Sequence, residues 1–515
     1  MRDFLARYPL SPFLAALNLF VPYTAGNITQ LEPYEIGLVA LILLTFAGLL
    51  TAILFYVVGT WQRAAICATA TIYVLFVLPS AMATPGELGF LGWATLLVAM
   101  ALVVWLIVQS RRSSDDYRFA NIILNSLLIG LLVVPTISIA QRGYHLVGAR
   151  PSPSELFPDL SGGAAMADGP DIWHFVLDRY AGADTLKAAY GYDNGPFLTE
   201  LRARGFTVAE RAAANYQRTA HSLASTLNLD FLTVFAEHAA TMQDDLLPLY
   251  RTIKNNRTGR FLHAQGYRLY HFGPWWEPTR HSDLADQHIN YLDMPDFLRF
   301  TLERSIISHV AALTGLVPGD GRADQCRRIH YQFDELDHLS KEPGRKHVFA
   351  HLLLPHPPFV VDAAGRCKSL AEVQSLTRSQ NYVAQIGYAN TRLVALLDRI
   401  AESGRASVII VQADEGPWPE AFAGDERSLG LDTTNVDWSK ADTRQLREKM
   451  LILLAIKGAA ANDLQLGATA TPVNLYRQIF ARYFGLDLPP LPDRSFLFQD
   501  RGHPYRFIDI SDRLR

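Results

Sequence analysis

The sequence predicts an N-terminal bundle of about five transmembrane helices, followed by an α/β domain with a doubly wound, mostly parallel sheet. Long apolar stretches are confined to the part before about residue 142, and short apolar runs alternate with helical patterns after residue 170. A chain of 515 residues is also too long for one compact core. We expect transmembrane helices in 1–142, a linker in 143–170 and a second, α/β domain in 171–515.

Four stretches have the roughly 20 mostly apolar residues that a membrane-spanning helix needs. They are Ile36–Val58, Ala64–Ala83, Leu88–Gln109 and Phe119–Ala140. Leu10–Ala25 is shorter and contains two prolines, and we expect it to be the first span. A cleaved signal peptide is the alternative, but further spans follow and no A-x-A site is evident.

The basic residues predict how the spans are oriented, because cytoplasmic loops carry an excess of Lys and Arg. The loops 26–35 and 84–87 contain no Lys or Arg, whereas six arginines lie at the other span ends: Arg2, Arg7, Arg63, Arg111, Arg112 and Arg118. Five spans with the N-terminus inside place all six in the cytoplasm. We therefore expect a multi-pass protein of the inner (cytoplasmic) membrane, with the second domain on the extracytoplasmic, periplasmic side.

The net charge bears on which partners the protein binds, and its cysteines bear on the compartment in which it lies. The net charge of -3 argues against a nucleic-acid partner recruited by bulk charge. Cys326 and Cys367 both fall in the second domain. If that domain is extracytoplasmic the two can form a disulfide, and two unrelated free thiols are the alternative.

The second domain alternates strand and helix patterns, which predicts a parallel sheet with its site at the carboxyl ends of the strands. Strands are expected at Ile172–Leu177, Tyr267–Phe272, His347–Leu354, Ser407–Gln412 and Leu451–Ile456. Helices are expected near Pro196–Arg204, Ala220–Leu229, Phe297–Leu313, Gln325–Leu339, Asn381–Ala401 and Pro472–Phe484.

Acidic residues end two of these strands. Asp178 closes the apolar run of DIWHFVLD, and Asp414 with Glu415 closes that of VIIVQADEG. Adjacent acids at a strand end are costly unless a positive charge lies between them, and a divalent cation with oxygen ligands is the simple answer. The alternatives are a helix cap at Asp178 and a solvated acidic turn at Asp414.

Three further segments contain candidate residues. Thr219, in NYQRTAHSLAS, begins a helical stretch whose free N–H groups suit a nucleophile attacking phosphorus, although an ordinary N-cap is the alternative. In FAHLLLPHPPF, His356 lies at a strand exit where it can reach a substrate oxygen or metal, and His351 fits a core position better. Trp275, in YHFGPWWEPT, can stack on a sugar or lipid glycerol, or simply pack.

In this order, the phrases VLDRY, NYQRTAHSLAS, FAHLLLPHPPF and QADEGPWP resemble the alkaline phosphatase superfamily. The likeness is to its membrane-anchored, sulfatase-like branch, which includes lipoteichoic acid synthases and phosphoethanolamine transferases, and it extends over residues 170–500 or so. No Cys-x-Pro-x-Arg or Ser-x-Pro-x-Arg is present, so a formylglycine-type sulfatase is not expected.

The resemblance implies that Thr219 is a catalytic nucleophile that takes a group from a donor and passes it to an acceptor. It implies one divalent metal ion, Mn or Mg rather than Zn, held by Asp178, Thr219, Asp414 and Glu415. It also implies substrate contacts, which we assign to His356, His351, Arg218 and Trp275. One departure is notable, since the superfamily usually has His where this chain has Glu415.

The resulting hypothesis is a metal-dependent transferase. It would move a phosphoglycerol, phosphoethanolamine or similar group from a membrane lipid donor to a surface glycan or lipid acceptor. Two alternatives stay open: a phosphate or sulfate ester hydrolase, and a non-catalytic membrane-tethered protein that keeps the fold.

Overall fold

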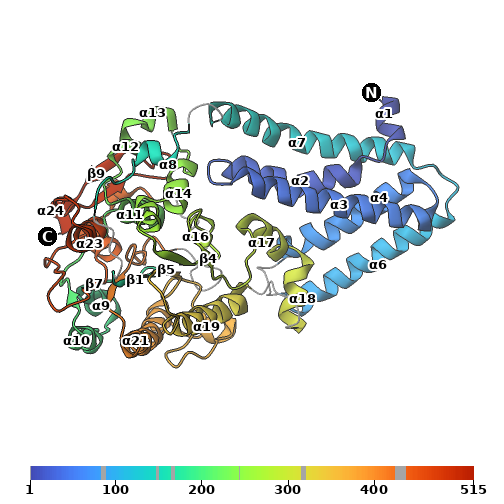
Figure 1. Ribbon diagram of the computed structural model, residues 1–515. Coiled ribbons are helices and arrows are strands. Elements are labelled where there is room, and N and C mark those ends of the chain that lie inside the picture. Colours follow the sequence, from blue (N-terminus) through green and yellow to red (C-terminus); the bar gives the residue numbers. More distant parts are fainter. Residues whose placement is uncertain are drawn as a thin grey trace. The chain divides into compact units, whose positions relative to one another are not determined.

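The computed structural model describes residues 2–82, 88–146, 150–163, 169–242, 244–314, 321–423 and 436–514. The loop 84–87 and parts of the expected linker 143–170 lie outside these residues. The chain divides into two compact units (Figure 1). The membrane unit comprises 1–149 and 294–324, and the sheet unit comprises 150–293 and 325–515.

Four helical stretches among the described residues are long and apolar enough to cross a membrane, as predicted. They are α3 (Pro33–Val58), the continuous α4–η1–α5 stretch (Trp61–Ile72, Tyr73–Val77 and Leu78–Met82), α6 (Phe90–Arg112) and α7 (Arg118–Leu146). Large apolar side chains such as Leu97, Trp105 and Val134 are exposed on them. Such a surface suits lipid, since the helices satisfy their own backbone hydrogen bonds.

The expected first span forms α2 (Ser11–Asn27), a helix of 17 residues that follows the short α1 (Arg2–Arg7). It packs against α3, α4 and α7. Ala15, Ala16 and Ala47 are buried in the shared core, where small side chains allow close helix approach. A fifth membrane crossing by α2 stays a prediction.

A segment from far along the chain also belongs to the membrane unit. Helices α17 (Asp296–Glu303) and α18 (Ile306–Thr314) lie within 294–324. The sequence predicted one helix, Phe297–Leu313, in the second domain. The helix is instead interrupted at Ser305, whose Oγ accepts a hydrogen bond from the N–H of Ile307 (3.1 Å) and so starts a new helix. We call residues 294–314 the returning segment.

The sheet unit is built on a seven-stranded sheet, in the order β2-β7-β6-β1-β5-β3-β4. β1 pairs in parallel with β5 and β6, and β3 pairs in parallel with β5 and β4. Only the pairings of β7, with β6 and with β2, are antiparallel among the described strands of this sheet. The predicted mostly parallel sheet is therefore confirmed. The strands are β1 (Asp171–Leu177), β2 (Thr207–Val208), β3 (Arg268–Phe272), β4 (Gln287–His288), β5 (Lys346–Leu352), β6 (Ser407–Gln412) and β7 (Leu454–Lys457).

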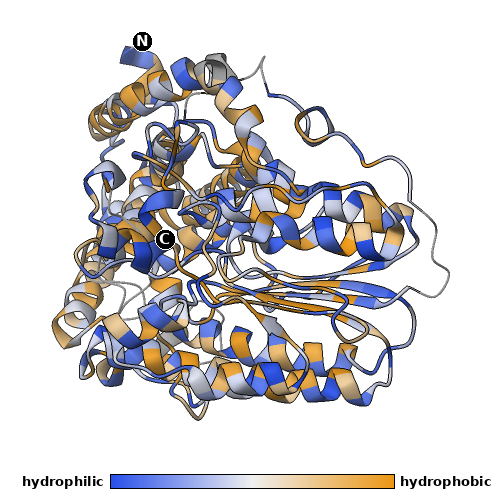
Figure 2. Cartoon of the chain, turned by 90° about the vertical axis from the view of Figure 1, so that its left-hand side faces the viewer, coloured by the Kyte–Doolittle hydropathy of each residue, from blue (hydrophilic) through white to orange (hydrophobic). Residues whose placement is uncertain are grey.

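Helices lie on both sides of this sheet (Figure 2), as a doubly wound fold requires. One side has α11 (Thr219–Asn228), α14 (Leu247–Lys254), α15 (Arg257–Ala264) and α23 (Leu475–Phe484). The other has α9 (Ala183–Tyr190), α10 (Gly195–Ala203), α19 (Gly321–Leu339) and α21 (Arg378–Glu402). The chain adds β3 and β5 on one side of β1 and β6 and β7 on the other, so a ligand crevice is expected at the carboxyl end of β1.

The remaining elements are short. They are α8 (Pro153–Leu156), α12 (Thr233–Glu237), α13 (Ala239–Met242), α16 (Glu277–Arg280), α20 (Leu370–Gln374), η2 (Trp438–Lys440), α22 (Thr443–Met450), η3 (Pro472–Asn474), β8 (Phe496–Phe498), β9 (Phe507–Asp509) and α24 (Ser511–Leu514).

Cys326 and Cys367 form a disulfide, with their Cα atoms 5.9 Å apart. Of the two alternatives that the sequence left open, pairing is therefore the one found. The bond joins α19 to the loop that follows β5.

Candidate metal and phosphoryl-transfer centre

Strand β1 brings Asp178 to the carboxyl edge of the sheet, where its side chain is buried. The next residue, Arg179, has φ 64°, a left-handed conformation that a bulky residue rarely adopts. Tyr382 holds this turn, since its hydroxyl donates to the carbonyl of Arg179 (2.6 Å) and accepts from the N–H of Ala181 (3.1 Å). A backbone conformation that costs energy and is held by its surroundings is typical of a functional site.

Strand β6 brings Asp414 and Glu415 to the same edge, and both are buried. Their burial rules out the solvated acidic turn. Asp414 Oδ1 accepts a hydrogen bond from the N–H of Arg179 (3.2 Å), which joins the ends of β6 and β1. A Cβ at Gly416 would lie 2.3 Å from the carbonyl oxygen of Glu448, so only glycine lets the chain pass this closely beside α22.

Three side chains converge at this edge. Asp178, His351 and Asp414 each offer one ligand atom, and these atoms all lie within 4.8 Å of one another. His351 comes from β5, and its Nε2 lies 3.2 Å from Asp178 Oδ2. Asp178 Oδ1 and Asp414 Oδ2 are buried without a hydrogen-bond partner among the described residues. Such oxygens are costly, and a divalent cation would satisfy both, so these residues fit the implied metal.

The two carboxyl groups have opposite pKa shifts. Burial raises the pKa of Asp178, but the charge of His356 and the hydrogen bond with His351 outweigh it and bring that pKa to about 2. Burial, and then repulsion by Asp178 and Glu415, raises the pKa of Asp414 well above its ordinary value. One carboxyl is thus held ionised while its neighbour resists ionisation, a conflict that a bound cation would remove.

Thr219 is the first residue of α11. A side-chain hydrogen bond from Thr219 to Asp414 partly offsets the rise in the pKa of Asp414. Thr219 is only half-buried, in contrast to the acids. The first N–H groups of a helix have no partner within the helix and can bind anionic oxygens. The hydroxyl therefore has the setting that a nucleophile toward phosphorus needs.

Glu415 is engaged by two cations. Its Oε1 lies 2.7 Å from Lys449 Nζ and 3.2 Å from Arg179 Nε. Lys449 comes from α22 and is fully buried. Burial lowers the pKa of Lys449 to about 8, although the charge of Glu415 opposes this shift. The role of Glu415 as a metal ligand stays a prediction.

The ring of Trp418 has three cations around it. The distances to its centroid are 4.5 Å from Arg218, 4.8 Å from Lys449 and 5.8 Å from Arg179. Cations over an indole face are attracted by the ring quadrupole. Of these three, Arg218 is half-buried and the other two are buried. Substrate contact by Arg218 stays a prediction.

His356 and Trp275 lie together at the exit of β5. The His356 ring is buried and lies edge-on to Trp275, with the ring centroids 6.4 Å apart. The charge of His356 also lowers the pKa of Asp178. Substrate contact by either residue stays a prediction.

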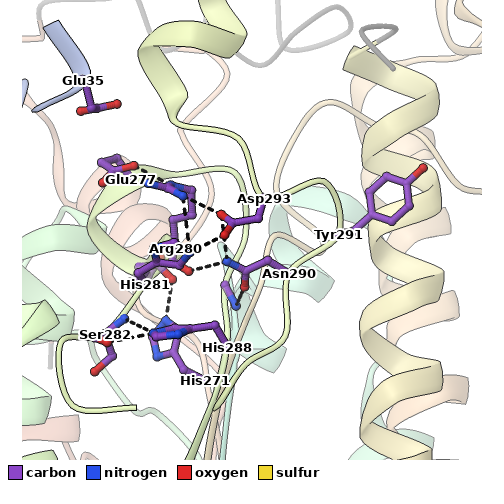
Figure 3. Close-up of polar contacts among 12 residues, drawn as sticks. Glu35, His271, Glu277, Arg280, His281, Ser282, His288, Asn290, Tyr291 and Asp293 are labelled. Carbon is purple, nitrogen blue, oxygen red and sulfur yellow. Dashed lines mark hydrogen bonds and ion pairs between the residues drawn. The ribbon is translucent and has the colours of Figure 1, made fainter. Parts of the chain in front are cut away.

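Sequence reasoning missed the residues that support His351. Thr279 Oγ1 lies 2.7 Å from His351 Nδ1, a contact that leaves Nε2 directed toward Asp178. Figure 3 shows how the loop around Thr279 is held: Arg280 pairs with Glu277 (2.6 Å) and with Asp293 (2.6 Å). No local pattern marks Thr279, because its role depends on a strand 72 positions away.

We expect Lys449→Met to destabilise the protein by about 3 kcal/mol, because it leaves Glu415 buried with Arg179 as its remaining close cation. Thermal unfolding of the full chain in detergent measures the effect. Lys440→Met is the matched control, since Lys440 is exposed and its pair with Asp437 should contribute little. Equal melting temperatures for the two variants would contradict this account of Glu415.

No protein-family model matches the chain, and no curated protein matches it. Solved structures do. The C-terminal periplasmic domain of EcEptC from Escherichia coli, in complex with Zn, has 10% sequence identity and a TM-score of 0.44, over 68% of this chain and 96% of that one. The integral membrane protein lipooligosaccharide phosphoethanolamine transferase A (EptA) from Neisseria meningitidis has 12% identity and a TM-score of 0.38, over 93% and 95%.

A putative sulfatase, yidJ from Bacteroides fragilis, has 13% identity and a TM-score of 0.37, over 64% of this chain and 77% of that one. At this distance, the function of this chain has to be inferred from its own residues.

Proposed function

We propose that the chain is a membrane-anchored, metal-dependent phosphotransferase. It transfers a phosphoglycerol, phosphoethanolamine or similar group from a membrane lipid to an extracytoplasmic glycan or lipid, through Thr219. The observation that carries the proposal is that Asp178 Oδ1 and Asp414 Oδ2 are buried with no hydrogen-bond partner in the part of the chain that the structure describes, near the half-buried Thr219. A metal ion between those oxygens and a nucleophile at a helix N-terminus are the parts that phosphoryl transfer requires.

The residues divide the work as follows. Asp178, Asp414 and Thr219 would hold the metal, and His351 offers a further ligand atom within 4.8 Å of those of Asp178 and Asp414. When bound, the metal supplies a positive charge that lowers the pKa of a coordinated hydroxyl and offsets charge on phosphoryl oxygens. Arg218 and the first N–H groups of α11 orient those oxygens.

In the first half-reaction, the Thr219 oxygen forms a bond to the donor phosphorus and the bond from phosphorus to the lipid alcohol breaks. The hydroxyl proton leaves toward Asp414, which accepts the Thr219 hydrogen bond, and the released alcohol takes up a proton. In the second, the oxygen of an acceptor hydroxyl forms a bond to the same phosphorus and the bond from phosphorus to the Thr219 oxygen breaks. The proton lost by the acceptor hydroxyl balances the one that the Thr219 oxygen takes up.

The kinds of ligand atom at this site indicate which metal ion it would bind. Two carboxylates and a hydroxyl favour Mg²⁺ or Mn²⁺, and the nitrogen of His351 favours Mn²⁺ over Mg²⁺. We therefore propose Mn²⁺, and measurement of the metal content of the purified protein tests that choice against zinc.

We expect removal of the metal by a chelator to abolish transfer and to lower the melting temperature by several degrees. The metal binds only the folded arrangement, so a hundredfold excess over its dissociation constant stabilises the protein by about 3 kcal/mol. Calorimetry with chelator and then with added Mn²⁺ measures both the loss and the recovery. An unchanged melting temperature would contradict a metal between Asp178 and Asp414.

The sheet unit is placed outside the cytoplasm in this proposal. The returning segment contacts the end of α2 and the starts of α3 and α6, span ends next to segments without Lys or Arg. Arg63, Arg111 and Arg112 lie at the opposite ends of the spans. The Cys326–Cys367 disulfide supports the same side, because such bonds persist in oxidising compartments.

Product analysis tests the reaction. The full chain is incubated in vesicles with radiolabelled head-group phospholipid and a glycan acceptor. Labelled glycan and diacylglycerol support the proposal, whereas release of the free head group without acceptor labelling indicates the hydrolase alternative. No turnover by metal-loaded protein with any phospholipid would support the non-catalytic alternative.

A further inference from the structure

The returning segment is anchored on the spans. The N–H of Phe297, in the first turn of α17, donates to Glu35 Oε1 at the start of α3 (3.2 Å). Tyr23 of α2 stacks on Phe297 and on Phe300, with centroid distances of 5.1 and 4.3 Å. The segment is therefore an integral part of the membrane unit, although the sheet unit supplies the chain on both sides of it.

The second helix of this segment, α18 (IISHVAALT), is mostly apolar and contains no Asp, Glu, Lys or Arg. His309 is buried and packs edge-on against Trp93 of α6, with ring centroids 6.3 Å apart. Val310 and Leu313 are exposed, by 37% and 67%. Phe90, at the start of α6, is 86% exposed. The helix α18 thus contacts the start of a membrane span through His309, and both helices expose apolar side chains.

We propose that α18 is an interfacial helix whose Val310 and Leu313 side chains lie among the lipid acyl chains beside the first turn of α6. A single exposed leucine would not be evidence for contact with lipid. A helix without charged residues that contacts the end of a membrane span, however, is expected to lie next to the bilayer. Arg304, exposed at the end of α17, has the length and charge to keep its guanidinium at the level of the lipid phosphates.

Both ends of the returning segment are fixed in the sheet unit. Asp293, just before it, pairs with Arg280 (2.6 Å) and His281 (2.8 Å), as Figure 3 shows. Cys326, shortly after it, forms the disulfide with Cys367. The chain therefore passes between the two units three times, after Ala149, Asp293 and Asp324. An embedded α18 adds a second membrane attachment to the one through α7.

The test uses the full chain in phospholipid vesicles, with Cys67→Ser to remove the free thiol. Leu313→Cys takes an environment-sensitive fluorophore. Leu97→Cys, on the exposed face of α6, is the lipid-facing reference, and Ala401→Cys, exposed at the end of α21, is the water-facing one. A nitroxide on a phospholipid acyl chain and iodide in the buffer serve as the two quenchers.

We expect the nitroxide lipid to quench the label at 313 at least twofold more strongly than the label at 401, and iodide to show the reverse order. Equal iodide quenching at 313 and 401 would overturn the proposal. Protection at 313 from both quenchers would overturn it too, since protein would then cover α18. If Leu313→Cys fails to fold, Val310→Cys carries the same comparison. The result is independent of whether the chain is a transferase.

Discussion

Thr219→Ala is expected to reduce transfer by about four orders of magnitude or more, because loss of a nucleophile removes the covalent step altogether. The variant should remain folded, since the lost hydroxyl contributes one hydrogen bond, worth about 1 kcal/mol. The initial rate of head-group transfer to the acceptor measures the first effect, and the melting temperature measures the second.

Two control variants sharpen this result. Thr219→Ser keeps an oxygen at the start of α11 and should retain much of the activity. Thr199→Ala removes a threonine hydroxyl that bonds the carbonyl of Gly195 on the exposed side of α10, and it should behave like the parent. Full activity in Thr219→Ala would exclude Thr219 as the nucleophile, and the chain would then need another group to carry the phosphoryl intermediate.

The fold was predictable because its signals are local. An apolar run such as VIIV predicts a strand buried on both faces, and it forms the centre of β6. The spans were predictable from length and hydropathy alone. The returning segment was not, because Phe297–Leu313 has an ordinary amphipathic pattern. Its place in the membrane unit depends on contacts with Glu35 and Tyr23, more than 260 positions earlier.

The candidate site was predictable in part for the same reason. Asp178 and Asp414 follow buried strands, and parallel strands end at one edge, so their convergence could be expected. The place of His351 in the cluster was less evident, because it lies inside an apolar stretch that suits a core residue. Lys449 carries no signal, because it is one of several basic residues in the amphipathic helix α22 and its contact with Glu415 depends on the fold.

Asp414→Asn is expected to weaken metal binding by a hundredfold or more and, without metal, to raise the melting temperature. The first effect follows because a buried carboxylate ligand is lost, a change of about 3 kcal/mol or more. The second effect is a gain in the stability of the metal-free protein. The pKa of Asp414 is raised in the folded state by burial and by the charges of Asp178 and Glu415. Its ionised form therefore opposes folding at neutral pH, and a neutral amide removes that cost.

These two effects together distinguish a metal-ligating role of Asp414 from a purely structural one. Melting curves with chelator and with Mn²⁺ should show metal stabilising the parent but not Asp414→Asn. Asp334→Asn, at an exposed pair with Arg392, should keep the parental response. A structural Asp414 would give a less stable variant in chelator and an unchanged gain with metal. We therefore expect Asp414→Asn to be more stable than the parent in chelator and less stable than the parent with Mn²⁺. This reversal would mean that the Asp414 carboxylate lowers the stability of the metal-free protein and raises it when a cation is bound.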